Sequence, residues 1–502
     1  MEIIGNQWQP LQKLGIAIAA NRRKRELLAD YLQTEGLHTP YAVTDRAGWH
    51  HGEYILPNGD IIGSERVFYN GDKSQAEAYH SQGSLEDWRA EIGTYLAGNS
   101  RLSLAIGTAL AAPLMQLLGM ESGGFHLYGD SSDGKTTAAK AALSVWGKPD
   151  ILKITWEGTG LGFSNIAGAR NDGFLVLDEI GQATPRVVAH TAYSVINGTS
   201  KAQGAKEGGN RAMKQWRILV FSTGEKTLRS YTQSQGADWQ AGQDTRLPSI
   251  AANAGKGYGI YDHLHGFDNG ALLSEHLEQA ANRYYGSAGR AFIQAIQTDR
   301  ENAIKRLNSE ISAFMATLPQ ESGQARRVAK RFAMIAAALS LAQEYGIIPH
   351  NQSSLGIRQC FDEWHSLNGG GKYEDRQIIE TAIDWLQTNA YSPRLIEWGH
   401  TMTERDHAGY RRYRSPPDFL GRIPKEDDDK PQEFWIIPAV FRAEICKSYE
   451  EKKVITVLKD AQWLKTQGKH HTCKRGNNTR YYVLIGMQPP ETPNPEPPPA
   501  DE

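Results

Sequence analysis

The chain has 502 residues, of which 40% are hydrophobic, so it is long enough to bury a large core and to form about three domains. Its formal net charge of -2 excludes a uniformly basic protein, and any surface that binds nucleic acid must therefore be local. The three cysteines lie far apart, which excludes a disulfide framework and favours a reducing, cytoplasmic location. No apolar run reaches the roughly 18 residues of a membrane span, so we expect no membrane partner.

Residues 1–84 are expected to form a small α+β module. The first 48 residues look helical and basic, and the charged run at 21–28 is typical of a solvated helix face, with phosphate binding as the alternative. Residues 48–63 predict two strands around a turn at 57–60.

An octet that fits G-x-x-x-x-G-K-[ST] follows an apolar run at 124–128 and precedes a helix-forming stretch. This order is typical of a nucleoside triphosphate site, because backbone N–H groups of the loop and of the helix N-terminus cradle phosphates. Lys135 would reach the β- and γ-phosphates, and Thr136 would hold Mg²⁺. The residues that we expect to bind ATP are Gly129, Asp130, Ser131, Ser132, Asp133, Gly134, Lys135, Thr136 and Thr137.

A second apolar strand, at 173–177, ends in Asp178 and Glu179. In the arrangement known as Walker B, the first acid orders Mg²⁺ and the second polarises the attacking water. The order and spacing of the two motifs therefore favour hydrolysis over binding alone.

A third short apolar strand, at 217–221, is followed by Ser222 and Thr223. In P-loop folds with an additional strand, the strand between those of the two motifs ends in a polar sensor that positions the attacking water. Both residues are candidates for this sensor, and the alternative is that they only begin a turn.

Two basic features complete the central region. Residues 197–214 are rich in glycine and positive charge and predict a β-hairpin that could grip a phosphate backbone, although an ordinary mobile loop fits almost as well. Its candidate contacts with nucleic acid are Lys201, Lys206, Arg211 and Lys214. Arg246 lies at a distance suited to an arginine finger that acts on a neighbouring subunit, but spacing alone fits a surface arginine better.

The motifs place a nucleotide-binding core at 85–270, and residues 102–120 within it predict a buried helix pair. The segments that follow are expected to be a helical lid with connecting helices (271–400), a linker (401–434), a winged-helix-like domain (435–487) and a disordered, proline-rich tail (488–502).

Between residues 48 and 386 the sequence resembles domain-of-unknown-function family 927, the helicase-like proteins of prophages and mobile genetic elements. The motifs that carry the resemblance are Gly48-Trp49, Leu56-Pro57, Gly98-Asn99, Gly123-Gly124-Phe125-His126-Leu127, Ser144-Val145-Trp146-Gly147, Leu177-Asp178-Glu179, Asn197-Gly198 with Lys201, Trp216-Arg217, Ser222-Thr223-Gly224-Glu225, Arg246-Leu247 and His265-Gly266. Asp133 departs from the family, whose loops often have a small residue there.

The resemblance implies an α/β P-loop NTPase of AAA+ type, related to the MCM replicative helicases, with a helical lid, an N-terminal α+β module and a C-terminal winged-helix-like domain. It implies a homo-oligomeric ring, with a hexamer favoured, that moves on single-stranded DNA in a central channel. Arg246 would be the finger, the hairpin near Lys206 would line the channel, and Arg327 is our choice for a second sensor arginine. A primase or a replication-loading protein is a possible partner.

Two functions from different classes fit the sequence. The preferred one is an ATP-driven DNA helicase or translocase. The alternative is a nucleotide-dependent regulatory or assembly ATPase that does not unwind DNA. The intact pair of motifs, the sensor candidates and Arg246 favour turnover.

Overall fold

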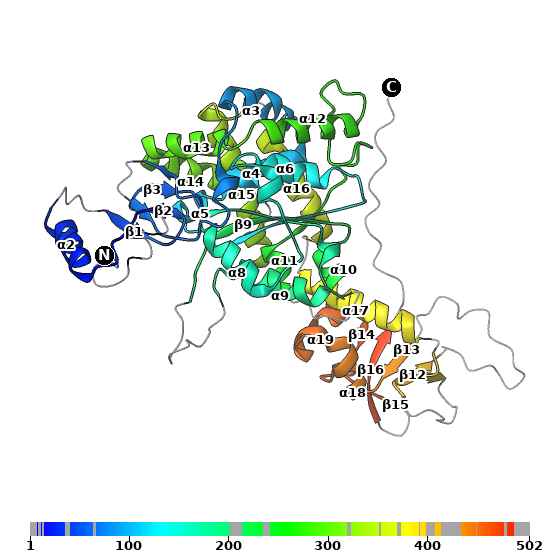
Figure 1. Cartoon of the computed structure of the whole chain (residues 1–502). Coiled ribbons are helices and arrows are strands. Elements are labelled where there is room, and N and C mark those ends of the chain that lie inside the picture. Colours follow the sequence, from blue (N-terminus) through cyan, green and yellow to red (C-terminus); the bar gives the residue numbers. More distant parts are fainter. Residues whose placement is uncertain are drawn as a thin grey trace, which may run out of the picture.

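The computed structural model describes residues 8, 12, 15–35, 41–63, 67–200, 213–233, 241–318, 323–350, 353–368, 373–390, 392–397, 407–412, 433–447, 449–475 and 479–485. These residues form a large central α/β body, a smaller C-terminal domain, and a helix, α2 (Arg22–Thr34), that projects from the body near the N-terminus (Figure 1). The predicted tail at 488–502 lies outside the described residues.

A parallel five-stranded sheet forms the centre of the body, with the strand order β10-β6-β9-β8-β7. Its strands are β6 (Gly123–Tyr128), β7 (Ile154–Thr155), β8 (Gly173–Asp178), β9 (Ile218–Gly224) and β10 (Ser249–Ala251). The three central strands are nearly continuous apolar runs, as expected for parallel strands that are covered on both faces. Because all five run in the same direction, the residues that follow β6, β8 and β9 meet at one edge of the sheet.

Alternate residues of the strands face two separate hydrophobic clusters. Phe174, Val176, Leu219 and Phe221 belong to the larger cluster, which includes helix α6 (Lys135–Leu143). Their sequence neighbours at 175, 177, 218 and 220 belong to a second cluster with α8 (Gly160–Ala169) and α9 (Pro185–Ile196). The sheet is therefore a central layer between two helical layers.

The predicted helix pair at 102–120 is present as α4 (Ser100–Ala111) and α5 (Leu114–Leu117). Every residue of α4 is buried, because the helix packs between the sheet and two later helices. Gly107 allows this close packing, since a Cβ at that position would lie 2.6 Å from Ile335.

The helices after the sheet share the larger cluster with it and do not form a separate core. They are α12 (Gly270–Arg283), α13 (Ser287–Thr298), α14 (Arg300–Ala316), α15 (Gly323–Glu344) and α16 (Ser353–Asn368). Three short helices connect strands of the sheet along the chain. They are α7 (Pro149–Leu152), which precedes β7, and α10 (Leu228–Gln233) and α11 (Ala241–Arg246), which lie between β9 and β10 in the sequence.

The N-terminal module is docked on the body. Its strands are β1 (Ala42–Thr44), β2 (Gly48–His50), β3 (Glu53–Ile55), β4 (Ile61–Ile62) and β5 (Val67–Tyr69). The antiparallel sheet β2-β3-β4 has three strands where two were expected, because His51 and Gly52 make a further turn. Trp49 Nε1 donates to Pro113 O at 2.8 Å, and the Tyr54 hydroxyl donates to Asp172 O at 2.8 Å. Helix α3 (Leu85–Glu91) then leads into the body.

The C-terminal domain begins earlier than the sequence indicated. Helix α17 (Tyr373–Asn389), expected among the connecting helices, packs in the hydrophobic cluster of this domain through residues such as Ile378 and Trp385. The predicted linker contains strand β12 (Gly409–Arg412) and the start of β13, so that part of the prediction was wrong. The other elements are β11 (Leu395–Glu397), β13 (Glu433–Ile436), α18 (Pro438–Val440), the π-helical turn η4 (Phe441–Cys446), α19 (Glu451–Asp460), β14 (Leu464–Lys465), β15 (Cys473–Arg475) and β16 (Thr479–Ile485).

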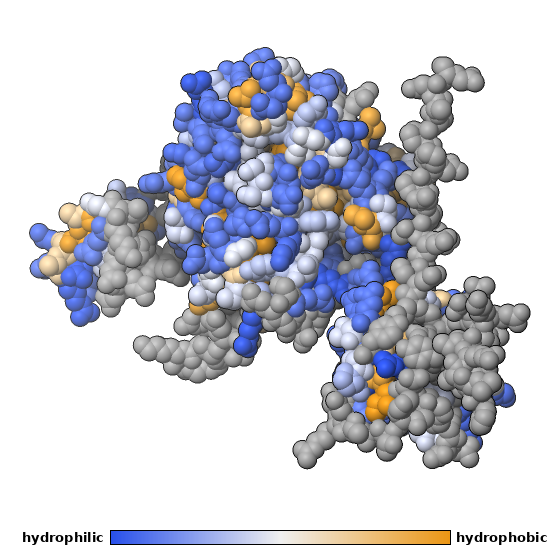
Figure 2. All heavy atoms as spheres, turned by 90° about the vertical axis from the view of Figure 1, so that its right-hand side faces the viewer, coloured by the Kyte–Doolittle hydropathy of each residue, from blue (hydrophilic) through white to orange (hydrophobic). Residues whose placement is uncertain are grey.

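Hydrophilic residues cover most of the visible face of the body, and apolar residues appear there in small separate groups (Figure 2). Helix α2 has no buried residue, in agreement with the solvated face expected for it. Within the described part of the chain, none of the helices is both long and apolar enough to cross a membrane.

Gly124 sets the spacing between β6 and β9. A Cβ at this position would lie 1.8 Å from Val220 O, so we expect Gly124→Ala to force the strands apart and to lower the free energy of unfolding by roughly 1–3 kcal/mol or more. Gly323→Ala is the matched control, because a Cβ there meets nothing within 4 Å; it should change stability by less than about 0.5 kcal/mol. Thermal unfolding of both variants checks the prediction, and equal midpoints would contradict it.

Candidate functional site

The loop at 129–136 joins β6 to α6, as the octet predicts. Gly134 lies just before α6 with φ of 88°, a conformation that glycine adopts without strain. The unpaired N–H groups of the first turn of α6 therefore lie at the loop, where they favour a bound anion. The Lys135 ammonium lies over the loop and donates to Gly129 O at 2.9 Å and to Asp130 O at 2.6 Å.

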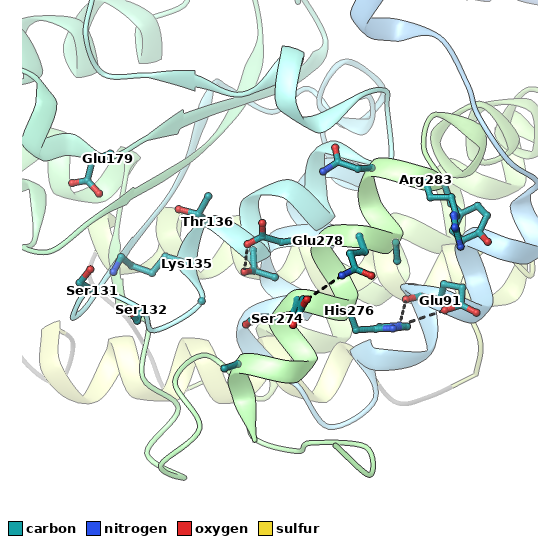
Figure 3. A pocket seen from close by; sticks show the side chains of 18 of the residues that line it. Glu91, Ser131, Ser132, Lys135, Thr136, Glu179, Ser274, His276, Glu278 and Arg283 are labelled. Carbon is teal, nitrogen blue, oxygen red and sulfur yellow. Dashed lines mark hydrogen bonds and ion pairs between the residues drawn. The ribbon is translucent and has the colours of Figure 1, made fainter. Parts of the chain in front are cut away.

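A cavity of about 1100 Å³ opens beside this loop (Figure 3). The expected site residues on its wall are Ser131, Ser132, Gly134, Lys135, Thr136, Thr137 and Glu179. Asp133 is not among the lining residues; its carboxylate lies against Gly129 instead. The departure from the family at Asp133 therefore does not bring a negative charge into the cavity.

The carboxyl ends of β8 and β9 bring two more expected residues together. The Thr223 hydroxyl donates to Asp178 Oδ1 at 2.5 Å and accepts from the Glu179 N–H at 3.0 Å. The Thr136 hydroxyl lies 3.3 Å from Asp178 Oδ1, so the loop and the acidic strand meet here. Glu179 has a positive φ of 56°, and its side chain faces the cavity.

Ser222, the other sensor candidate, lies on the opposite face of the sheet. Its Oγ accepts from Trp156 Nε1 at 2.9 Å and is 2.8 Å from His126 Nδ1. His126 Nε2 must carry its proton, because it donates to Lys226 O at 2.9 Å; Nδ1 therefore accepts from the Ser222 hydroxyl. Ser222 thus takes part in a buried hydrogen-bond chain and does not contact Asp178.

Several residues of the site were not anticipated from the sequence. Lys153, which follows α7, forms an ion pair with Asp178 Oδ2 at 2.7 Å. Glu278 on α12 accepts from Thr137 at 2.8 Å and from Lys140 at 2.9 Å, which fixes α12 against α6. Other unpredicted lining residues are Gln82, Glu91, Glu225, His276 and Arg283. Glu225 ends one of the motifs but was given no role there, and no local pattern marks the other four. Figure 3 shows Glu91 and Arg283 away from Lys135 and Glu179.

Arg246 lies at the other edge of the sheet. Arg246 is the last residue of α11, three residues before Ser249 of β10, and Ser249 pairs with His126 of β6. Arg246 therefore lies near the end of the sheet where these parallel strands begin, whereas the candidate site lies at the end where they finish. Arg246 Nη1 donates to Asn197 Oδ1. Arg331 lies nearby and donates to Thr245 O at 2.9 Å; burial and the charge of Arg246 lower its pKa to about 10.

Arg327, the expected second sensor, is exposed on α15 one turn before Arg331 and does not line the cavity. No arginine from that helix is among the lining residues. If Arg327 contacts a nucleotide, the geometry therefore favours the nucleotide of a neighbouring subunit.

The base of the predicted hairpin is described, and its two sides are antiparallel. Thr199 pairs with Gln215, and Ser200 N donates to Lys214 O at 2.8 Å. The Lys214 ammonium donates to Asn165 Oδ1 at 3.1 Å. Lys201, Lys206 and Arg211 lie outside the described residues.

Comparisons with known proteins agree with the expected family. Residues 3–215 match the profile of a family described as domain of unknown function (DUF927), which confirms the resemblance. No curated protein sequence matches the chain.

Among solved structures, one titled "SCCmec type IV Cch - active helicase" aligns with a TM-score of 0.69 and 19% identity, over 96% of this chain and 86% of that chain. The two therefore share a fold. A structure titled "The A form apo structure of NrS-1 C terminal region-CTR" aligns with a TM-score of 0.29 and 9% identity, over 92% of this chain and 89% of that chain, and carries no argument.

The buried hydrogen-bond chain predicts a pH dependence of stability. Burial lowers the pKa of His126 from 6.5 to about 4, so the unfolded chain binds the proton more tightly. The stabilisation that comes from neutral His126 is fully present above pH 6.5. At pH 4 we expect the free energy of unfolding to be lower by about 3 kcal/mol.

Urea unfolding at pH 7 and pH 4 checks this prediction. His126→Gln, which cannot titrate, should lose less stability than the wild type over the same range. Parallel losses in the two proteins would show that His126 is not responsible.

Proposed function

We propose that the chain is an ATP-hydrolysing DNA helicase or translocase that works as a homo-oligomeric ring, with a hexamer favoured. The observation that carries the proposal is the meeting of Lys135, Thr136, Asp178, Glu179 and Thr223 beside one large cavity. These residues come from three separated segments, and together they supply the parts that phosphoryl transfer to water needs. The strand order, with β9 between β6 and β8, supports an AAA+ type of P-loop fold.

The donor set fits Mg²⁺. The Thr136 hydroxyl and the Asp178 carboxylate are hard oxygen ligands that already lie within 3.3 Å of each other. Among the described residues there is no group of three or more His, Cys, Asp or Glu side chains placed to hold a metal. This agrees with Mg²⁺ that is bound through one carboxylate, one hydroxyl and phosphate oxygens. When bound, Mg²⁺ would neutralise charge on the β- and γ-phosphates.

The remaining roles follow from position. Lys135 exchanges the two loop carbonyls for phosphate oxygens, which are charged and therefore stronger acceptors. Glu179 faces the cavity and orients the attacking water. Thr223 holds the Glu179 backbone and Asp178 in a fixed relation, so the sensor role is assigned to Thr223 rather than Ser222.

DNA as the partner is supported by two observations. The aligned structure of the same fold is titled an active helicase. The antiparallel base at 198–200 and 214–216 is consistent with the hairpin proposed for the basic segment between them. Phosphate contacts from such a hairpin would be independent of base sequence.

Loss of the two motif residues should have different effects. We expect Lys135→Ala to lose nucleotide binding and turnover, whereas Glu179→Gln keeps binding but hydrolyses ATP at least about a hundredfold more slowly. Binding is measured with a fluorescent ATP analogue, and hydrolysis as phosphate release with and without single-stranded DNA. A forked duplex tests unwinding.

The outcomes separate the candidate functions. Stimulation by DNA and ATP-dependent unwinding support the motor. Wild-type hydrolysis without either would favour a regulatory or assembly ATPase, and a fully active Glu179→Gln would refute the role of Glu179.

Arg246 should act only between subunits. Because it lies at the edge of the sheet opposite to its own loop, Arg246→Ala should retain nucleotide binding and lose turnover. Mixing it with Lys135→Ala should restore part of the activity, since a mixed ring contains some interfaces with both residues intact. The measurement is ATPase activity at a constant total protein concentration, and activity no greater than the sum of the separate variants would contradict the prediction.

A further inference from the structure

Lys153 has an unusual position for a residue outside both motifs. It follows α7 directly, and its ammonium lies 2.7 Å from Asp178 Oδ2. The Asp178 side chain is only 5% exposed, whereas the Lys153 side chain is 25% exposed. Among the described residues, Lys153 forms its ion pair with Asp178, and it is not among the residues that line the cavity.

The two oxygens of Asp178 are bound by different groups. Thr223 donates to Oδ1 and Lys153 pairs with Oδ2, while the Thr136 hydroxyl lies 3.3 and 3.4 Å from the two oxygens. A buried carboxylate needs such a partner, because an uncompensated charge with little access to water is costly. In the proposed ATP site the same carboxylate lies next to the loop that holds the phosphates. Without a cation beside it, Asp178 would repel the nucleotide.

We propose that Lys153 is a built-in counter-ion that neutralises Asp178 while no Mg²⁺ is bound and releases Oδ2 when Mg²⁺ takes that place. This inference rests on the proposed ATP site. Its consequence is that nucleotide can bind to the protein before the metal does. Lys153 is a positioning residue, because it acts through Asp178 and does not touch the nucleotide.

The chemistry of the pair fits an exchangeable partner. A lysine ammonium is a point charge on a flexible stem, whereas arginine would form a planar, two-pronged contact that is harder to release. The partial exposure of Lys153 gives its ammonium access to water once it leaves Asp178. A purely structural ion pair would need neither property.

The test measures nucleotide binding, with no turnover involved. The affinity of a fluorescent ADP analogue is determined by anisotropy, in excess Mg²⁺ and in EDTA, for the full chain and its variants. The variants are Lys153→Met, Lys153→Arg, Asp178→Asn and the double variant Lys153→Met/Asp178→Asn. Lys148→Met is the matched control for loss of one positive charge, because Lys148 is exposed at the start of α7.

We expect Lys153→Met to weaken binding in EDTA by about tenfold or more, and by clearly less in Mg²⁺. Lys148→Met should behave as the wild type in both conditions, and Lys153→Arg should behave as the wild type in EDTA, where only its positive charge is needed. Asp178→Asn should bind the analogue more tightly than the wild type in EDTA, because Lys153 then has no carboxylate to neutralise. Adding Lys153→Met to it should remove that gain. These last two variants keep the test informative even if Lys153→Met alone fails to fold.

Equal loss for Lys153→Met in the two conditions would overturn the proposal, and so would an Asp178→Asn affinity in EDTA no higher than that of the wild type. A Lys153→Arg variant that binds as weakly as Lys153→Met in EDTA would also overturn it, because charge would then not be the cause. If the wild type binds no nucleotide in either condition, the proposed function itself fails, and this result is distinct from the others.

Discussion

The position of β9 between β6 and β8 is the constraint on which the candidate site depends. Neighbouring strands are roughly 4.8 Å apart, so an inserted strand separates the loop strand from the acidic strand by about 10 Å and leaves room between their ends. Thr223 at the end of β9 bridges this interval through its contacts with Asp178 and with the Glu179 backbone. The distance between β6 and β9 depends on Gly124, where these two strands lie too close together for any side chain.

Strand alternation then assigns each polar residue at these strand ends to one face. Thr223 is in phase with Leu219 and Phe221, and Asp178 with Phe174 and Val176, which all face the layer that contains α6. Ser222 and His126 point to the opposite layer, where they bond to each other and Trp156 bonds to Ser222. Burial lowers the pKa of His126 to about 4, which keeps this side chain neutral at pH 7, so the residues of the candidate site and this hydrogen-bond chain lie on opposite faces of the sheet.

This alternation also explains how much the sequence could predict. The octet and the acidic pair are local patterns. As expected, the octet lies between a strand and a helix, and the acidic pair lies at the end of a strand. To choose between Ser222 and Thr223, one must know which face of the sheet α6 covers. The sequence of a single segment does not give this information. Lys153 could not be identified from the sequence, because it contacts Asp178, 25 residues further along the chain, and no motif marks Lys153. The strand β12 lies at the start of a charged, proline-containing stretch, and its residues form a strand by pairing with β11 and β13.

The opposite edge of the sheet has a different electrostatic character, which bears on assembly. Arg246 and Arg331 lie close enough for the first to lower the pKa of the second, and their hydrogen-bond partners, Asn197 and the Thr245 carbonyl, are neutral. Arg331 is buried and also lies within the electrostatic influence of Glu121, so Arg246 is the arginine of this pair that could reach an anion outside the subunit. The loop at 129–136 of the same chain is on the far side of the sheet and cannot supply that anion. In the proposed ring, contact between two copies would bring the candidate nucleotide site of one copy to Arg246 of the next.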